Sequence, residues 1–242
     1  MASRRSVPLA ILLPPSEGKA EGGRTPRWKA GSGSFGAALR RPRAEVVAAL
    51  AAAKGGDATL LGVNGKHLAR AQEANRALDG ALTLPACERY TGVVWEHLSP
   101  DTLSTTARRR ATESVVVVSG LLGLVGFDDP VPDYRVKMGA SLKPMGKLST
   151  WWREPLSTAL NDWGAGRVVI DLLPNEHRAA WTPGDTVREH VVVTFVEKTG
   201  KVAGHDAKAA KGMLARHLLE SAGDPMDALD SWKHPRFRLT LT

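Results

Sequence analysis

The sequence predicts an α/β fold, organised as a single compact domain around a mixed central sheet. Three short apolar runs lie far apart in the chain and are typical of buried strands: "ILL" from Ile11, "VVVV" from Val115 and "VVIDLL" from Val168. Segments with helical periodicity separate them, and this alternation favours a sheet covered by helices. With 242 residues, 43% of them hydrophobic, the chain is long enough to bury one sizeable core.

The remaining elements follow from periodicity and from turn residues. Residues 21–36 are rich in Gly and Ser and predict a loop, and residues 127–138 predict another. Helices are expected over 43–54, near Trp95, over 148–164 and over 206–222, and a further strand over 190–198. Residues 55–78 predict a turn, a short helix, a tight glycine turn and a second helix, within a helical segment that spans 43–79.

Polar side chains follow each of the three strand-like runs. They are Ser16, Glu17 and Lys19 after the first run, Ser119 after the second, and Asn175, Glu176 and His177 after the third. If the strands are neighbours in the sheet, these side chains converge on one crevice, where a lysine and a carboxylate can stabilise charge and transfer protons. The alternative interpretation of residues 16–19 is an ordinary surface turn.

The helix expected over 206–222 has a basic face. Lys208, Lys211 and Arg216 fall within one broad face, and Gly212 lets another group approach the backbone closely. One interpretation is a clamp for phosphate or carboxylate. The other is a basic face that points into solvent.

The stretch "LLGVNGKHLARA", residues 60–71, has the pattern of a helix-hairpin-helix turn. In that motif the backbone amides of the turn and a following lysine contact DNA phosphates without reading the base sequence. Gly62, Val63, Gly65 and Lys66 are the predicted DNA contacts.

The formal net charge of +8 suggests polyanionic partners such as nucleic acid or phosphorylated molecules. The excess is distributed along the chain, with small clusters at 40–43, 108–110 and 208–217. No apolar run approaches the roughly 20 residues of a membrane span, and the apolar run after the first arginines is too short for a signal peptide. A cytoplasmic protein without a membrane partner is expected.

Several chemistries lack their sequence pattern. The single cysteine, Cys87, excludes an internal disulfide and is expected to be a core residue. The seven histidines show no metal-binding spacing, so neither a metal nor a cofactor is predicted. The glycines at 120, 123 and 126 do not have the spacing of a dinucleotide-binding loop, and they predict a tight strand-to-helix turn.

An ordered set of short motifs runs through nearly the whole chain: "LLPPSEGK", "YTG", "SGLLGLV", "PDYRVKMG", "WWREPL", "VVIDL" and "KAAKG". In this order the chain resembles the YaaA family of peroxide stress response proteins, in the branch that opens with Pro-Pro-Ser-Glu-Gly-Lys. The resemblance implies a cantaloupe-like α/β fold with a helix-hairpin-helix at 60–71. It also implies DNA binding and a role in limiting oxidative damage linked to intracellular iron. The recurring polar positions of the family fall on Ser16, Glu17, Lys19, Tyr90, Gly92, Ser119, Tyr134, Arg135, Lys208, Lys211 and Gly212.

The chain departs from the family pattern at a few positions. Pro174 and His177 stand where the family commonly has Ser and Tyr, Gly126-Phe127 stands where Arg-Pro is frequent, and Leu122 replaces an aromatic residue. A change of substrate and simple drift both predict such departures.

Two functions remain open from the sequence. The first is a stress protein that binds double-stranded DNA. The second is an enzyme that acts on a small anionic or nucleobase-containing molecule; iron sequestration is the weakest alternative because no ligand motif supports it. For the enzyme, the candidate catalytic residues are Ser16, Glu17, Lys19, Tyr90, Ser119, Glu176 and His177. The candidate binding residues are Tyr134, Arg135, Lys208, Lys211, Gly212 and Arg216. The sequence leaves the oligomeric state open.

Overall fold

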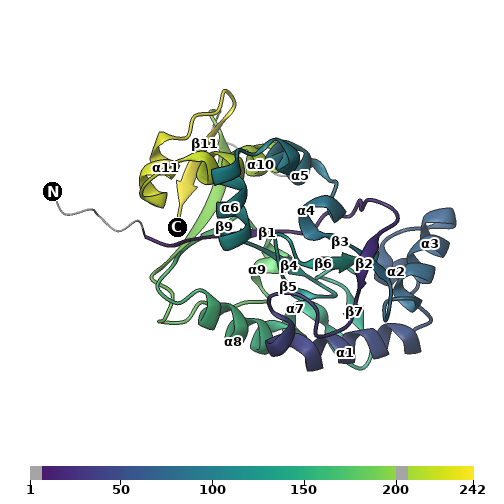
Figure 1. Ribbon diagram of the computed structural model, residues 1–242. Coiled ribbons are helices and arrows are strands. Elements are labelled where there is room, and N and C mark those ends of the chain that lie inside the picture. Colours follow the sequence, from purple (N-terminus) through teal and green to yellow (C-terminus); the bar gives the residue numbers. More distant parts are fainter. Residues whose placement is uncertain (1–6, 200–206) are drawn as a thin grey trace.

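A six-stranded mixed sheet forms the centre of the computed structural model, which describes residues 7–199 and 207–242 (Figure 1). Its strand order is β11-β10-β9-β1-β4-β5. The strands are β1 (Leu9–Leu13), β4 (Val115–Ser119), β5 (Gly123–Gly126), β9 (Val168–Asp171), β10 (Glu189–Glu197) and β11 (Phe237–Leu241). The pairs from β10 to β4 are parallel, and the outer strands β5 and β11 are antiparallel to their neighbours. The predicted α/β fold with a mixed central sheet is confirmed.

Strand β1 lies in the middle of the parallel part of the sheet. Ile11 is paired with Val115 of β4 on one side and with Ile170 of β9 on the other, and all three side chains are buried. The strand ends before Pro14 and Pro15, which have no N–H group to donate to a neighbouring strand. Because β9, β1 and β4 are parallel neighbours, their carboxyl ends meet at one edge of the sheet, as predicted.

Helices cover both faces of the sheet (Figure 1). Those on one side are α1 (Gly36–Ala52), α7 (Leu148–Trp151) and α8 (Arg153–Trp163), and those on the other are α5 (Val93–Leu98), α6 (Thr105–Ser114) and α10 (Ala207–Glu220). The helix predicted over 206–222 corresponds to α10, and its first residue lies outside the described residues. The single helix predicted over 148–164 is divided at Trp152, because Pro155 cannot donate a hydrogen bond to the carbonyl of Trp151.

Smaller elements complete the fold. They are β2 (Arg24–Arg27), β3 (Leu82–Pro85) and β6 (Pro130–Pro132), which form a separate sheet, the hairpin β7 (Ser141–Leu142) with β8 (Gly146–Lys147), and the helices α2 (Ala58–Leu61), α3 (Gly65–Arg76), α4 (Ala86–Arg89), the 3₁₀ turn η1 (Pro100–Thr102), α9 (Asn175–Arg178) and α11 (Pro225–Ser231). The order short helix, glycine turn, longer helix over 55–78 is the predicted one. Within the described ranges, no helix is both long and apolar enough to cross a membrane.

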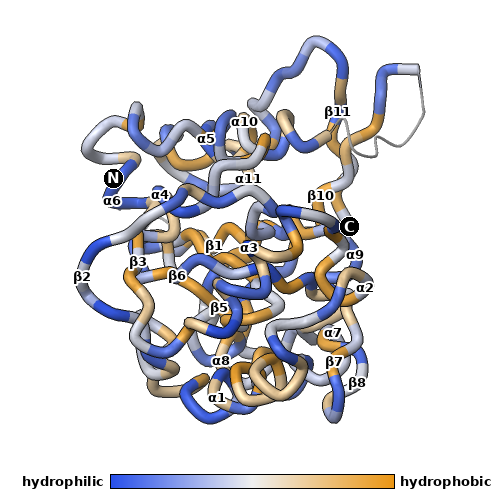
Figure 2. Tube along the Cα trace, turned by 90° about the vertical axis from the view of Figure 1, so that its right-hand side faces the viewer, coloured by the Kyte–Doolittle hydropathy of each residue, from blue (hydrophilic) through white to orange (hydrophobic). Residues whose placement is uncertain are grey.

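Two segments predicted as loops contain strands. Strand β2 lies within 21–36 and β6 within 127–138, and both pair with the strand β3. All four residues of β2 are exposed, and Figure 2 shows this strand as hydrophilic, so no apolar pattern indicated it. The prediction failed because backbone pairing at a sheet edge does not require a buried face.

The glycine-rich segment after β4 was predicted as a strand-to-helix turn, and this prediction is wrong. The chain reverses at Leu121 and Leu122 and returns as β5, antiparallel to β4. Gly123 has a φ of +68°, and a Cβ there would come within 3 Å of the side chains of Trp152 and Leu156. The glycine therefore serves a tight hairpin packed under α7 and α8.

Helix α1 begins seven residues before the predicted start at Arg43 and contains Pro42. Arg43 itself is buried, and its guanidinium donates to the carbonyls of Leu122 (2.8 Å), Leu124 (2.7 Å) and Ser32 (2.6 Å). Burial lowers the pKa of Arg43 to about 10. One member of the basic cluster at 40–43 thus holds the β4–β5 hairpin and does not face a partner.

Candidate functional site

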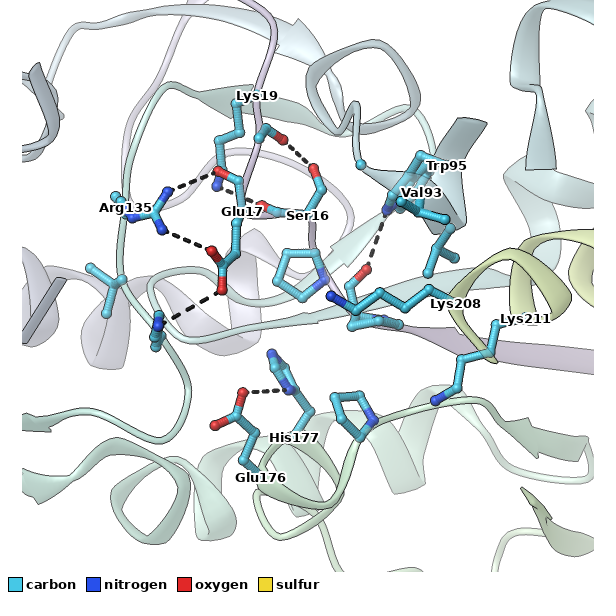
Figure 3. A pocket seen from close by; sticks show the side chains of 18 residues that line it. Ser16, Glu17, Lys19, Val93, Trp95, Arg135, Glu176, His177, Lys208 and Lys211 are labelled. Atoms are coloured by element: carbon cyan, nitrogen blue, oxygen red, sulfur yellow. Dashed lines mark hydrogen bonds and ion pairs between the residues drawn. The ribbon is translucent and has the colours of Figure 1, made fainter. Parts of the chain in front are cut away.

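A cavity of about 490 Å³ lies at the carboxyl ends of β1 and β9 (Figure 3). Its wall combines apolar side chains, among them Pro14, Val93 and Trp95, with a large set of charged and polar ones. The polar set consists of Ser16, Glu17, Lys19, Arg135, Lys137, Glu176, His177, Lys208 and Lys211. The structure therefore brings together the predicted polar residues that follow the first and third strands, except Asn175. Ser119, which follows the second strand, does not line the cavity.

The turn after β1 is fixed by hydrogen bonds of its own. The Ser16 hydroxyl donates to the carbonyl of Gly18 and accepts from the amide of Thr91 at 3.0 Å. Gly92 lies against this turn, and a Cβ at that position would come within 2.9 Å of the Ser16 Cβ. The two prolines that end β1 and this bonded turn hold residues 16–19 in one conformation.

Lys19 reaches inward from this turn. Its ammonium donates to the carbonyl of Ser16 at 2.9 Å and lies 4.2 Å from the ring centroid of Tyr134 and 5.7 Å from that of Tyr90. No carboxylate forms an ion pair with it among the described residues. Burial lowers the pKa of Lys19 to about 7, with the charges of Arg135 and Arg89 acting in the same direction. Asp133 and Glu17 oppose this change without reversing it.

Glu17 is exposed at the mouth of the cavity and is held by two cations. The Arg135 guanidinium donates to its Oε2 at 2.8 Å, and the Lys137 ammonium lies 3.8 Å from its Oε1. Burial by itself would raise the pKa of Glu17, but Lys137 and Arg135 outweigh it and hold the pKa below its usual value. Glu17 is therefore an ionised carboxylate near neutral pH.

The facing wall comes from α9, which follows β9 directly (Figure 3). His177 is buried, and its Nδ1 has no hydrogen-bond partner among the described residues. The Glu176 Oε1 lies 3.7 Å from that nitrogen, which is too far for a hydrogen bond. Burial, reinforced by the charge of Lys211, lowers the pKa of His177 to about 4, so the ring is neutral at pH 7.

Helix α10 supplies Lys208 and Lys211 to the cavity. Lys208 is exposed, and its ammonium has no acceptor within the described part of the chain. Lys211 is half-buried and donates to the carbonyl of Leu172 at 2.6 Å. Burial lowers its pKa to about 8 against the opposing charge of Asp171.

The other predicted members of this basic face lie elsewhere. Arg216 is about 80° from Lys208 and 140° from Lys211 around the helix axis. It donates to the carbonyls of Leu98 and Ser99 and pairs with Glu220 at 2.7 Å, which fixes the end of α5. Gly212 packs against α5, where a Cβ would lie 2.2 Å from the carbonyl oxygen of Val94. Gly212 therefore permits the close approach of helix α5 to α10.

Tyr90, Tyr134 and Ser119 form a buried chain of hydroxyl groups behind Lys19. The two tyrosine hydroxyls are 2.9 Å apart, and the Ser119 Oγ is 2.7 Å from that of Tyr134. Ser119 also accepts from the amides of Leu121 and Leu122 in the hairpin. Burial raises the pKa of Tyr134 to about 12 and that of Tyr90 well above its usual value. These three residues support the wall that Lys19 contacts and do not line the large cavity.

A second cavity of about 330 Å³ lies on the other side of Lys19, against α3. Its wall includes Tyr134, Arg135 and the α3 residues His67 and Arg70. Arg70 is already paired with Asp133 at 3.0 Å. Lys19 thus lines both cavities, together with Glu17, Gly18 and Arg135.

The predicted DNA contacts are in the turn between α2 and α3. Gly62 ends α2 in the left-handed conformation, with a φ of +64°, and Gly65 begins α3. Gly62, Gly65 and Lys66 are exposed, and Val63 is half-buried. The Arg135 Nε donates to the carbonyl of Leu61 at 3.1 Å, so the same arginine contacts this turn and Glu17 of the cavity.

The sequence did not indicate two charged residues in or near this region, Lys137 and Asp171. Lys137 lines the cavity from an irregular loop, and no periodicity indicated where it would point. Asp171 is fully buried at the end of β9 and accepts from Arg178 at 2.7 Å, His190 at 3.1 Å and the amide of Leu173 at 2.8 Å. Burial by itself would raise its pKa, but these partners hold the pKa below its usual value. The presence of an aspartate inside the apolar run "VVIDLL" could have indicated a buried, hydrogen-bonded carboxylate at this position.

The departures from the family pattern separate into two groups. Pro174 and His177 line the large cavity. Leu122, Gly126 and Phe127 are buried in the protein core, away from it. Cys87 is buried as expected, and burial raises its pKa. Over residues 7–199 and 207–242, no group of three or more His, Cys, Asp or Glu side chains is arranged to hold a metal ion.

These features define an α/β protein with a basic cavity at the carboxyl edge of its parallel strands. Comparison with known proteins gives the family: the chain belongs to the peroxide stress protein YaaA family, whose model matches residues 9–241. It is 37% identical to a UPF0246 protein of Streptomyces coelicolor over 223 residues, which is 90% of this chain and 85% of that protein. UPF0246 proteins of Corynebacterium glutamicum and Corynebacterium efficiens are 34% and 33% identical, covering 92% and 88% of this chain and 89% and 86% of their own.

Proposed function

We propose that the large cavity is the active site of an enzyme that acts on a small anionic molecule. The observation that carries this proposal is Lys19, a half-buried lysine without a carboxylate partner among the described residues, at a wall of a cavity that also exposes Lys208. A buried, unpaired ammonium lowers stability, so a fold that keeps one commonly uses it in chemistry. With a pKa of about 7, Lys19 exchanges a proton readily near neutral pH.

The other side chains fit complementary roles. Lys208, Lys211 and Lys137 present positive charge around the cavity and would attract a carboxylate or phosphate. The neutral His177 ring forms part of the cavity wall without adding charge to it. The apolar surface of Val93 and Trp95 would contact the uncharged part of the molecule.

The test is thermal stabilisation by a panel of nucleotides, phosphorylated metabolites and small carboxylic acids. A ligand at about 100 times its dissociation constant adds about 2.7 kcal/mol to the unfolding free energy, which raises the melting temperature of a chain of this size by about 5–10 °C. Lys208→Ala should remove most of this shift at the same ligand concentration. Lys233→Ala, an exposed lysine beyond α11, is the matched control and should keep it. Equal shifts in all three proteins would contradict the proposal.

A second function, DNA binding, is favoured by a separate observation. The turn at Gly62–Lys66 projects exposed backbone and one lysine away from the sheet, and the chain carries a net charge of +8. We propose contact with DNA phosphates without sequence preference. Binding would then weaken steeply with salt, with a slope of about −0.9 for each phosphate contacted.

Lys66→Ala should reduce that salt slope by about one unit, whereas Lys233→Ala should leave it unchanged. A slope that is the same in wild type and Lys66→Ala would show that the turn does not contact DNA. Because the two proposals use different lysines, failure of one leaves the other intact.

A further inference from the structure

The ammonium of Lys19 is poorly matched to its surroundings. A protonated lysine has three N–H donors, and within residues 7–199 and 207–242 this one has a single acceptor, the carbonyl of Ser16 at 2.9 Å. The nearest acidic side chain on the same turn, Glu17, is held by Arg135 and Lys137 instead. The flanking ring of Tyr134 compensates only in part for the lost water. This environment favours the neutral amine.

A neutral amine in a cavity is a nucleophile toward carbonyl carbon. The large cavity adds the feature that selects among carbonyl compounds, because Lys208, whose ammonium has no acceptor within the described part of the chain, offers positive charge to a carboxylate in the same space as the amine. In the second cavity, by contrast, Arg70 is already paired with Asp133, which leaves less charge for a ligand. The carbonyl compound would therefore approach from the large cavity.

We propose that Lys19 forms an imine with a small 2-oxo carboxylate bound in the large cavity. This inference rests on the proposed function and names the class of substrate. The lone pair of Nζ attacks the keto carbon, the C=O pair moves to oxygen, and one N–H proton is transferred to that oxygen, giving a carbinolamine. Departure of the hydroxyl with the second N–H proton, as one water molecule, leaves the C=N bond, with no change of oxidation state.

The remaining side chains have defined places in this arrangement. Lys208 binds the carboxylate, while Lys137 stays beside Glu17 at 3.8 Å. The Val93 side chain, which is 39% exposed, limits the length of the substrate at the cavity wall. The rings of Tyr90 and Tyr134 flank the amine, with centroids at 5.7 Å and 4.2 Å, while their hydroxyls bond each other at 2.9 Å and stay out of the reaction. Lys19 is the only one of these residues that forms a covalent bond.

The experiment traps the imine in the full-length wild-type chain with pyruvate and cyanoborohydride, followed by peptide mapping of the reduced adduct. We expect Lys19 to be modified at least about tenfold faster than the exposed reference Lys233, since reactivity depends on the fraction of neutral amine. The rate at Lys19 should rise with pH up to about 7 and then level off. Modification spread over the exposed lysines, with Lys19 no faster than Lys233, would overturn the inference.

Two cavity-filling variants identify the side of approach. Val93→Phe narrows the large cavity and should slow trapping at Lys19 by about tenfold, whereas Ala74→Phe narrows the second cavity and should leave the rate unchanged. The reverse order would refute the assigned approach. Stabilisation by anionic ligands without any trapping at Lys19 would reject the imine and keep the proposed function. Absence of both would reject the two together.

Discussion

Replacing Lys19 with methionine measures what the buried ammonium does to stability. Methionine has a similar length, is apolar and carries no proton to exchange. The pKa of Lys19 is about 7 in the folded chain and 10.5 in the reference state. Between these values the folded chain binds fewer protons than the unfolded one, so the stability of the wild type rises with pH across that window. Below pH 7 both states are protonated and the full destabilisation by the buried charge is present.

The size of the effect follows from the two pKa values. One pKa unit corresponds to about 1.4 kcal/mol, and between pH 6 and pH 9 the wild type should gain about 2 kcal/mol relative to Lys19→Met, once partial solvent access is allowed for. The variant should therefore be more stable than the wild type at pH 6, with the difference shrinking by that amount at pH 9. His177 and Lys211 also titrate, but they are present in both proteins and cancel in the comparison.

Urea denaturation at pH 6, 7.5 and 9 provides the assay, with the slope of unfolding free energy against urea as a check that both proteins unfold in the same way. Lys233→Met, at an exposed position, is the matched control for the substitution itself. A difference between Lys19→Met and the wild type that does not change with pH would refute the reasoning, because it would mean that the ammonium keeps its ordinary pKa.

Three further substitutions test buried contacts, two of them in elements that form the site and one in the β4–β5 hairpin. Gly212→Ala should lower the unfolding free energy by about 2–3 kcal/mol, because the alanine Cβ would overlap the carbonyl of Val94. This loss is expected although alanine favours helices more than glycine does. A variant that is more stable than the wild type in thermal unfolding would contradict the contact. His177→Leu should retain its stability in acid. The pKa of His177 is about 4 in the folded wild type and 6.5 in the reference state, so the wild type should lose about 2–3 kcal/mol of unfolding free energy relative to the variant as the pH falls from 6.5 to 4. Parallel acid denaturation curves would argue against a neutral buried ring. Arg43→Met should lower the unfolding free energy by at least about 3 kcal/mol, because it leaves several buried carbonyls without donors. A decrease below about 1 kcal/mol would show that these hydrogen bonds are dispensable.

The part of the site that could be predicted from the sequence is the part delivered by parallel strands. Lys19 and Glu17 follow β1, and His177 follows β9, so the shared direction of the strands is enough to place them at one edge. Lys208 and Lys211 could be predicted because three residues along a helix return nearly to the same face. In these cases a local rule and the global fold agree.

The failures have equally specific causes. Ser119 ends a parallel strand, but the chain reverses there into a hairpin, so its hydroxyl turns inward to the amides of Leu121 and Leu122. Arg216 is too far around α10 to join the lysines. Lys137 belongs to a loop whose path depends on tertiary contacts, and β2 has no buried face to reveal it. Sequence patterns indicate which residues are buried. They do not indicate the location of residues that is determined by backbone pairing or by the packing of loops.

The walls of the large cavity come from separate segments arranged around one sheet: the turn after β1, the start of α5, the loop that carries Arg135 and Lys137, the short helix α9 after β9, and the helix α10. A substitution in one segment therefore changes one wall of the cavity. The departures at Pro174 and His177 fall in the α9 segment, which is only a few residues long and carries no part of the sheet. A lineage with this architecture can exchange one wall of its binding site in very few mutational steps while the amine and the cations opposite stay in place, so closely related members can diverge in specificity long before they diverge in shape.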